Sequence, residues 1–245
     1  GAAVAAAAPA SDEEIASNTD RLEGRVLAED FGPPPDYGNA EYWETYYAAQ
    51  AGQMDRIYDW IADWAEVAPL VEGLLAQADG SQPVLHLGCG NSELPEEMHD
   101  AGYTRQTCVD VSPAVVARMA ARNAGRPGLR WLAADATDLE TVLPSDEFAL
   151  VVDKSTLDAL LCNEQYAPVI AKFLHEAFRV TAPGGVYVSI SFNEPDRMLR
   201  LLRHRAFNWQ VRALPLLDRK QKESGSFMYI CVKNQPTEES VAQWP

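Results

Sequence analysis

Four residues with ligand-binding chemistry stand at the ends of three successive strand-like segments. Gly88 and Gly90 follow the apolar segment 83–87, and a turn that lacks Cβ atoms lets a ligand approach the backbone closely. Asp110 comes twenty residues after Gly90, where a carboxylate can accept hydrogen bonds from both hydroxyls of a ribose. Asp135 follows the third segment, where an acid or its neighbouring backbone can pair with an adenine amino group. These positions predict a site for a cofactor that contains a nucleoside.

Dinucleotide-binding proteins share this arrangement, and one position argues against a dinucleotide. Glu93 occupies the place of the third glycine in Gly-x-Gly-x-x-Gly, where a carboxylate would repel a pyrophosphate. We therefore expect a cofactor without phosphates. Neither a phosphate-binding Gly-x-x-x-x-Gly-Lys-[Ser/Thr] loop nor a Gly-x-Ser-x-Gly nucleophile motif occurs in the sequence. The four histidines lack the spacing of a metal site or a catalytic triad, so we expect structural or solvent-facing roles for them, at positions 86, 99, 175 and 204.

Alternating strands and helices must position these residues. Strands are expected at 83–87, 106–109, 129–133 and 148–152, and helices from Ser92, from Pro113 and over 164–180. Ser112 before Pro113 supplies an N-cap followed by a proline at the first helical position. Because segment 148–152 is uniformly apolar, it suits a strand buried on both faces of a parallel sheet.

The final third of the sequence departs from simple alternation. The residues Pro183, Gly184 and Gly185 predict a firm stop between the long helix and a strand over 186–191. A helix near 196–205 and strands near 210–214 and 226–232 follow, and the last two strands have no helix between them. The predicted fold is therefore α/β, a Rossmann-like sheet of seven mostly parallel strands with an antiparallel terminal hairpin, helices on both faces and a helical N-terminal cap.

The predicted domain occupies residues 39–235, between two tails. Residues 1–38 are rich in alanine, acids and proline and cannot bury much apolar surface, so we expect a disordered acidic tail, and 236–245 form a C-terminal tail. Apolar positions recur at helical spacing from residue 39 to about 76, which indicates the cap. Its aromatic residues, among them Tyr42, Trp43, Tyr58 and Trp64, either anchor the helices on the core or face the site.

The net charge of −16 argues against binding to nucleic acids or anionic membranes and favours a basic partner, although acidity also serves solubility. Residues 1–40 hold eight acids and two arginines, so a charge of about −10 lies beyond the tail. No apolar run approaches the roughly 18 residues that a membrane span needs. The four cysteines are scattered without metal-site spacing, so no metal is expected, and a reducing, cytoplasmic location fits them best.

Several motifs resemble those of known enzymes. Residues 87–92 (Leu-Gly-Cys-Gly-Asn-Ser), 109–112 (Val-Asp-Val-Ser) and 179–185 (Arg-Val-Thr-Ala-Pro-Gly-Gly) look like successive signatures of the class I methyltransferases, which use S-adenosylmethionine. Residues 41–43 (Glu-Tyr-Trp), 58–60 (Tyr-Asp-Trp) and 153–160 (Asp-Lys-Ser-Thr-Leu-Asp-Ala-Leu) also resemble the methyltransferase-like family that modifies translation elongation factor 1-alpha. This similarity covers about residues 40–232.

The resemblance implies S-adenosylmethionine as cofactor and a set of residues that contact it: Trp43, Tyr47, Tyr58, Gly88, Cys89, Gly90, Asp110, Val111, Asp135, Ala136 and Lys154. The sequence departs from the family at Ser155, where members usually have glycine. Family members methylate either lysine or an N-terminal amine, so the acceptor does not follow from the resemblance.

Methyl transfer to an amine is an in-line displacement by a neutral nitrogen, so positioning carries much of the catalysis. An acidic or aromatic mouth would hold the incoming cation. Asp153 and Lys154, at the end of the fourth strand, are the candidate catalytic residues there. Asp153 could instead cap a strand end or pair with Lys154, and Asp158 is expected to support the next helix.

Three hypotheses follow for the function. The favoured one is methylation of a lysine or N-terminal amine in a basic protein such as translation elongation factor 1-alpha. A small-molecule methyltransferase of the same fold would need a closed apolar pocket over the cofactor. A non-catalytic interaction module is the third, and the intact residues Gly88, Gly90, Asp110 and Asp135 count against a loss of cofactor binding.

Overall fold

The computed structural model describes residues 35–50, 59, 61–74, 80–162, 164–217 and 222–235, and Tyr37 onward forms one compact unit. Most of the predicted N-terminal tail, the C-terminal tail and Tyr58 lie outside the described residues. None of the helices within the described ranges is long and apolar enough to cross a membrane.

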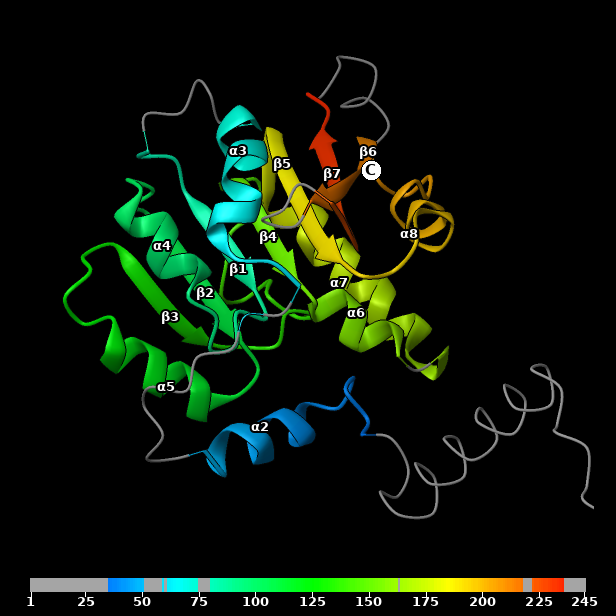
Figure 1. Ribbon diagram of the computed structural model, residues 1–245. Helices are drawn as coiled ribbons and strands as arrows, with labels where there is room; N and C mark the ends of the chain where they lie inside the picture. Colours follow the sequence, from blue (N-terminus) through cyan, green and yellow to red (C-terminus); the bar gives the residue numbers. More distant parts are fainter. Residues whose placement is uncertain are drawn as a thin grey trace, which may run out of the picture. The chain divides into compact units, whose positions relative to one another are not determined.

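A seven-stranded sheet in the order β3-β2-β1-β4-β5-β7-β6 forms the centre of the domain (Figure 1). Strands β1 to β5 are parallel, and β7 pairs antiparallel with both β5 and β6. This sheet confirms the predicted fold class, including the terminal hairpin. The strands are β1 (Val84–Leu87), β2 (Gln106–Asp110), β3 (Leu129–Ala133), β4 (Phe148–Lys154), β5 (Thr181–Ser191), β6 (Trp209–Leu217) and β7 (Glu223–Lys233).

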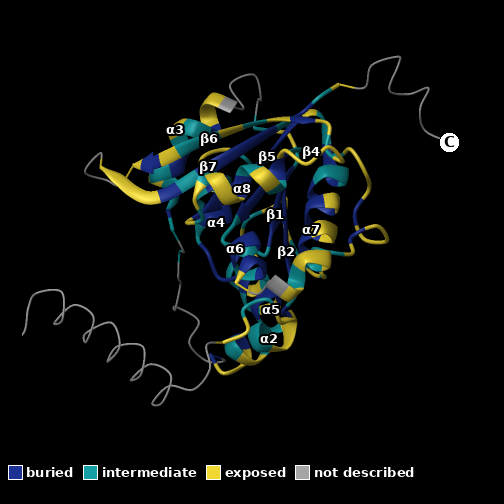
Figure 2. Ribbon diagram, turned by 90° about the vertical axis from the view of Figure 1, so that its right-hand side faces the viewer, coloured by how far each residue is buried: buried dark blue, intermediate teal, exposed yellow. Residues whose placement is uncertain are grey.

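Helices cover both faces of the sheet, as predicted. Neighbouring residues of one strand enter different cores: Leu150 and Val152 belong to a cluster with α3 and α4, whereas Val151 packs with α6, α7 and α8. Figure 2 shows the central strands mostly buried, with exposed positions on the outer faces of the helices and on the terminal hairpin. The helices are α2 (Ala40–Ala48), α3 (Trp64–Leu74), α4 (Leu94–Asp100), α5 (Pro113–Arg122), α6 (Thr156–Leu161), η1 (Glu164–Tyr166), α7 (Ala167–Val180) and α8 (Pro195–Leu202).

The helix starts are set by local chemistry. The Ser112 hydroxyl accepts a hydrogen bond from the Val115 amide, which confirms the predicted N-cap of α5. Helix α4 begins at Leu94, two residues later than the predicted start at Ser92. Trp64 at the start of α3 is partly buried, packs edge-to-face on Tyr103 and lies against the core, so it anchors the cap.

The predicted stop between α7 and the fifth strand is wrong. Strand β5 begins at Thr181, directly after α7, and pairs with Phe148 before the glycines are reached. The ladder then resumes at Leu150 and Val186, so the residues between form an irregularity within β5. A Cβ at Gly185 would lie 2.8 to 3.1 Å from three backbone oxygens, which explains the glycine at this position.

We expect Gly185→Ala to destabilise the domain by about 2 kcal/mol, because backbone oxygens cannot move aside as a flexible side chain can. The free energy of unfolding in urea would measure the loss. Gly73→Ala is the matched control, since nothing lies within 4 Å of a Cβ at that position of α3. Alanine there should stabilise the helix by up to about 1 kcal/mol. Equal effects of the two substitutions would contradict this account of Gly185.

Candidate active site

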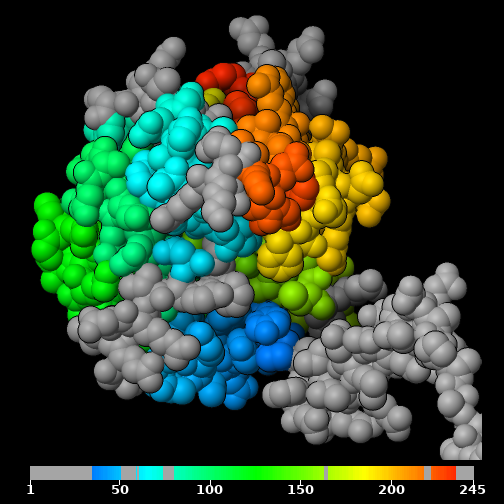
Figure 3. Space-filling model, viewed as in Figure 1, coloured from blue at the N-terminus to red at the C-terminus, as the bar shows by residue number. Residues whose placement is uncertain are grey.

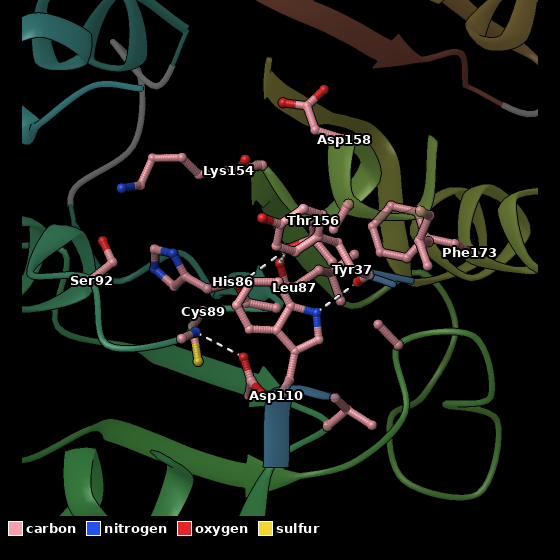
Figure 4. A pocket seen from close by; sticks show the side chains of 18 of the residues that line it. Tyr37, His86, Leu87, Cys89, Ser92, Asp110, Lys154, Thr156, Asp158 and Phe173 are labelled. Carbon is pink, nitrogen blue, oxygen red and sulfur yellow. Dashed lines mark hydrogen bonds between the residues drawn. The ribbon is translucent and has the colours of Figure 1, made fainter. Parts of the chain in front are cut away.

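One cavity of about 310 Å³ opens at the edge of the sheet where the parallel strands end. It brings together ten of the eleven residues predicted to contact the cofactor, and the eleventh, Tyr58, is not described. In Figure 4, His86, Ser92 and Lys154 lie on one side of the cavity and Phe173 on the other. The ten residues are Trp43, Tyr47, Gly88, Cys89, Gly90, Asp110, Val111, Asp135, Ala136 and Lys154.

Asp110 is a buried carboxylate, only 6% exposed, at the end of β2. Its Oδ2 accepts from the Gly90 amide at 2.8 Å and its Oδ1 from the Ser112 amide at 3.0 Å. Burial raises the pKa of Asp110, while the backbone hydrogen bonds oppose that shift. Because a carboxylate can accept about four hydrogen bonds, Asp110 retains capacity for a ligand beside its backbone partners, which also include Val111. Asp135 is exposed by comparison and accepts from the Thr137 amide at 2.8 Å.

Contacts within the protein, and not only the approach of a ligand, require glycine in the turn after β1. Gly88 and Gly90 both have positive φ, +65° and +51°. A Cβ on Gly88 would lie 2.1 Å from the Thr156 hydroxyl oxygen, and one on Gly90 would lie 2.6 Å from that of Tyr47. The Thr156 hydroxyl lies within hydrogen-bond distance of the carbonyls of Leu87 and Gly88, at 2.9 and 3.1 Å, so the start of α6 is fixed against the turn.

Lys154 is nearly buried, and its ammonium pairs with Asp59, Nζ to Oδ1 at 2.5 Å. Burial lowers the pKa of Lys154, and the charge of Asp59 opposes that shift. Asp59 also accepts from the Ser92 hydroxyl and from the Glu93 amide at 3.2 Å. One carboxylate of the cap segment therefore binds both the end of β4 and the start of α4.

The structure corrects the expectation that Asp153 lies at the mouth of the site. Asp153 is fully buried and does not line the cavity. Its Oδ1 accepts from the amides of Thr156 and Leu157, and its Oδ2 accepts from the hydroxyls of Tyr187 and Ser189. Burial, with the nearby charge of Asp158, raises the pKa of Asp153 to about 7. Successive side chains of a strand point to opposite faces, so Lys154 reaches the cavity and Asp153 enters the core.

The helix α2 forms one wall of the cavity. Trp43 and Tyr47 line it, and the Trp43 indole donates to the Tyr37 carbonyl at 2.7 Å. Glu44 accepts from the Ser112 hydroxyl and from the Ala114 amide, which fixes α2 against the first turn of α5. In Figure 3, the deep-blue residues that lead into α2 lie next to yellow-green residues of the region of α6. Tyr37 and Gly38, which the predicted boundary placed in the tail, line the cavity as well.

Several cavity residues were not predicted from the sequence, among them His86, Thr156, Asp158 and Phe192. Asp158 supports more than its own helix, because it accepts hydrogen bonds from the segment that follows β5. The signal that would have found Phe192 is its position directly after the fifth strand, at the same edge as Gly88 and Asp110. Among the described residues, no group of histidine, cysteine, aspartate and glutamate is arranged to hold a metal ion.

His86 is a buried imidazole with the Nε2 nitrogen 2.6 Å from the Gln106 side-chain oxygen. The Gln106 amide nitrogen donates to the carbonyls of Pro95 and Tyr103, so its oxygen is the acceptor and Nε2 carries the proton. Burial lowers the pKa of His86 from 6.5 to about 4, and the nearby charge of Lys154 contributes. His86 is therefore neutral at physiological pH.

This low pKa predicts a loss of stability in acid that depends on His86. The unfolded chain binds the proton near pH 6.5 and the folded chain only near pH 4, so the stabilisation is complete above 6.5 and falls as the pH drops toward 4. Between pH 7 and pH 5 we expect wild type to lose about 2 kcal/mol more than His86→Leu, which has no imidazole to titrate. Urea unfolding of both proteins at the two pH values would measure this difference. Parallel losses in the two proteins would show that His86 does not titrate in this way.

Comparisons with known proteins agree with this architecture. A family model described as a methyltransferase domain matches residues 84–185. The eEF1A lysine and N-terminal methyltransferase of Danio rerio is 33% identical over 205 residues, which span 81% of this chain but only 28% of that protein. EEF1A lysine methyltransferase 4 of Mus musculus is 34% identical over 186 residues, 72% of this chain and 69% of that protein.

Among solved structures, the N-methyltransferase NodS of Bradyrhizobium japonicum in complex with S-adenosyl-L-homocysteine has a TM-score of 0.52 and 16% identity. The match covers 69% of this chain and 85% of NodS, and this likeness concerns the fold alone. The strand order with a glycine-rich turn after β1 defines the class I methyltransferase fold. The chain belongs to the S-adenosylmethionine-dependent methyltransferases of this class, within the family that contains the eEF1A lysine methyltransferases.

Proposed function

We propose that the chain methylates a lysine or an N-terminal amine of a basic protein, with translation elongation factor 1-alpha as the candidate substrate. The observation that carries the proposal is the buried Asp110 beside an intact glycine-rich turn, in a chain whose relatives are named as eEF1A methyltransferases. The net charge of −16 supports a cationic partner, since opposite charges increase the rate of encounter.

The cavity residues fit S-adenosylmethionine without any phosphate-binding loop. Asp110 would accept hydrogen bonds from the ribose hydroxyls, and Asp135 with Ala136 would face the adenine. Gly88 and Gly90, which both line the cavity, would place the backbone of the turn beside the methionine part. When bound, the cofactor supplies an electrophilic methyl group on a sulfonium.

The acceptor amine must be neutral when it attacks, so its proton has to leave first. His86, with a pKa of about 4, is too weak a base to remove a proton from an ammonium group at neutral pH. Lys154 is a cation already paired with Asp59, and Asp153 lies in the core. We propose that the proton passes to solvent at the mouth, and that the residues of the cavity act by excluding water and aligning the amine.

The test is transfer of a radiolabelled methyl group from S-adenosylmethionine to the proteins of a whole-cell lysate and to purified elongation factor 1-alpha. We expect one labelled protein band, with the modified amine located by peptide mass spectrometry, and no label with Asp110→Ala at limiting cofactor. Label confined to small molecules would favour a small-molecule methyltransferase. Cofactor binding without methyl transfer to proteins or to small molecules would favour an interaction module.

A further inference from the structure

The strand order divides the cavity into a cofactor end and an acceptor end. Along the sheet edge, Asp135 follows β3, Asp110 ends β2, and Gly88 and Gly90 follow β1. A cofactor with its adenine at β3 and its ribose at β2 places its sulfur near β1 and beyond. The next strands in the sheet are β4 and β5, so the loops after these two strands flank the position of the acceptor.

Phe192 is the first residue after β5, and it is 51% exposed while it lines the cavity. Two other large apolar residues of the described chain are comparably exposed, Val142 at 44% and Leu217 at 41%, and neither lines the cavity. Phe192 thus combines an exposed apolar surface with a place at the acceptor end.

The backbone around Phe192 is held in place by Asp158, which is itself 2% exposed. The Phe192 amide donates to Asp158 Oδ2 at 3.3 Å. On the two sides of Phe192, the Ser191 hydroxyl and the side-chain Nδ2 of Asn193 both donate to Asp158 Oδ1, the latter at 2.6 Å. In Figure 4 the Asp158 carboxylate points away from the glycine-rich turn. Its oxygens therefore serve the loop after β5 rather than the cofactor.

Two further side chains, from β7 and α8, fix the same loop. The Tyr229 hydroxyl donates to the Asn193 carbonyl at 2.5 Å. Arg197 donates to the Asn193 side-chain oxygen at 3.0 Å and to the Leu161 carbonyl at 2.7 Å, which joins the loop to the end of α6. The exposed ring is thus attached to a fixed backbone, so its exposure is a property of the folded site.

We infer that Phe192 forms a wall of the channel that receives the acceptor lysine, and that Asp158 is the positioning residue that holds this wall. The inference rests on the proposed function. A phenyl ring suits both parts of a lysine side chain, because the methylene groups pack on its face and the ammonium group is attracted to its π electrons before the proton leaves.

Steady-state kinetics of the full chain with elongation factor 1-alpha test the inference. Phe192→Ala should raise KM for the protein by about tenfold with kcat little changed, and calorimetry should find the Kd for S-adenosylmethionine unchanged. Phe192→Tyr should restore KM to near the wild-type value. The controls are Val142→Ala and Leu217→Ala, which remove similarly exposed apolar groups outside the cavity and should leave KM unchanged.

Asp158→Asn tests the positioning role. It should raise KM in the same way, and the double variant Asp158→Asn/Phe192→Ala should show no rise beyond that of Phe192→Ala, since both changes affect one contact. Additive effects of the two substitutions would overturn the role of Asp158. An unchanged KM in Phe192→Ala, with wild type active on the protein, would overturn the inference while leaving the proposed function intact. A wild-type chain that methylates no protein would overturn both, so the two failures are distinguishable.

Discussion

Asp110→Ala should weaken the binding of S-adenosylmethionine by at least about tenfold. Two charge-assisted hydrogen bonds to the ribose, each worth about 1.5 to 3 kcal/mol, would be lost with the carboxylate. The same substitution removes the acceptor for the amides of Gly90 and Ser112, so the glycine-rich turn loses a support as well. Isothermal titration calorimetry measures the change in Kd directly.

Asp138→Ala is the control for this experiment. Asp138 is an exposed aspartate after β3 that does not line the cavity, so its removal should leave the Kd unchanged. Circular dichroism would verify the fold of both variants. An unaltered affinity in a folded Asp110→Ala protein would show that the carboxylate does not contact the cofactor.

The second large effect is expected from the ion pair between Asp59 and Lys154. Asp59→Asn keeps the shape of the side chain and one of the two oxygens that accept from Ser92 and Glu93, but it removes the charge that faces a nearly buried ammonium group. Breaking a buried pair from one side costs about 3 kcal/mol or more, so we expect a loss of that size in the free energy of unfolding. Chemical denaturation with urea measures it.

The double variant Asp59→Asn/Lys154→Met separates the charge pair from other roles of the two residues. Methionine removes the ammonium group and keeps most of the apolar stem, so the double variant should be more stable than Asp59→Asn alone. If Asp59→Asn unfolds at the same urea concentration as wild type, the pair makes no net contribution. If the double variant loses as much stability as Asp59→Asn and Lys154→Met lose together when measured singly, the two residues do not act as a pair.

The sheet could be predicted from the sequence because its strands are short apolar runs separated by clear turn and capping residues. The cofactor residues could be predicted for a related reason: the carboxyl ends of parallel strands meet at one edge, so Gly88, Asp110 and Asp135 had to lie close together. Ser112 is an example of a purely local signal, since its hydroxyl caps the helix that begins at the next residue.

The direction of a side chain within a buried strand is harder to predict. Segment 148–152 is apolar throughout, so no alternation of polar and apolar residues indicates which face is which. That is why Asp153 was expected beside Lys154 at the mouth, although the two side chains point to opposite faces. The proline and two glycines at 183–185 misled for a different reason, because a stop signal is equally compatible with an irregularity inside a strand.

Long-range polar contacts were not predictable from spacing. Asp59 and Lys154 are 95 positions apart, and neither is in a motif that specifies the other.

Glu93 was interpreted as a residue that would repel a pyrophosphate, yet its carboxylate pairs with Arg122 at 2.9 Å and does not line the cavity. The turn still differs from the Gly-x-Gly-x-x-Gly motif of dinucleotide-binding proteins, because it lacks the third glycine. Repulsion of a pyrophosphate by the charge of Glu93 is not the reason for that difference.

The contact between Tyr47 and Gly90 limits how this chain can change during evolution. The Tyr47 hydroxyl occupies the space of a Cβ at position 90, and Gly90 also has a positive φ that favours glycine. A larger residue at 90 therefore requires a shorter side chain at 47 and a tolerance of the backbone strain. In homologues with this arrangement, we expect the two positions to vary together, with tyrosine at the first only where the second is glycine. An alignment of the family would reveal that covariation.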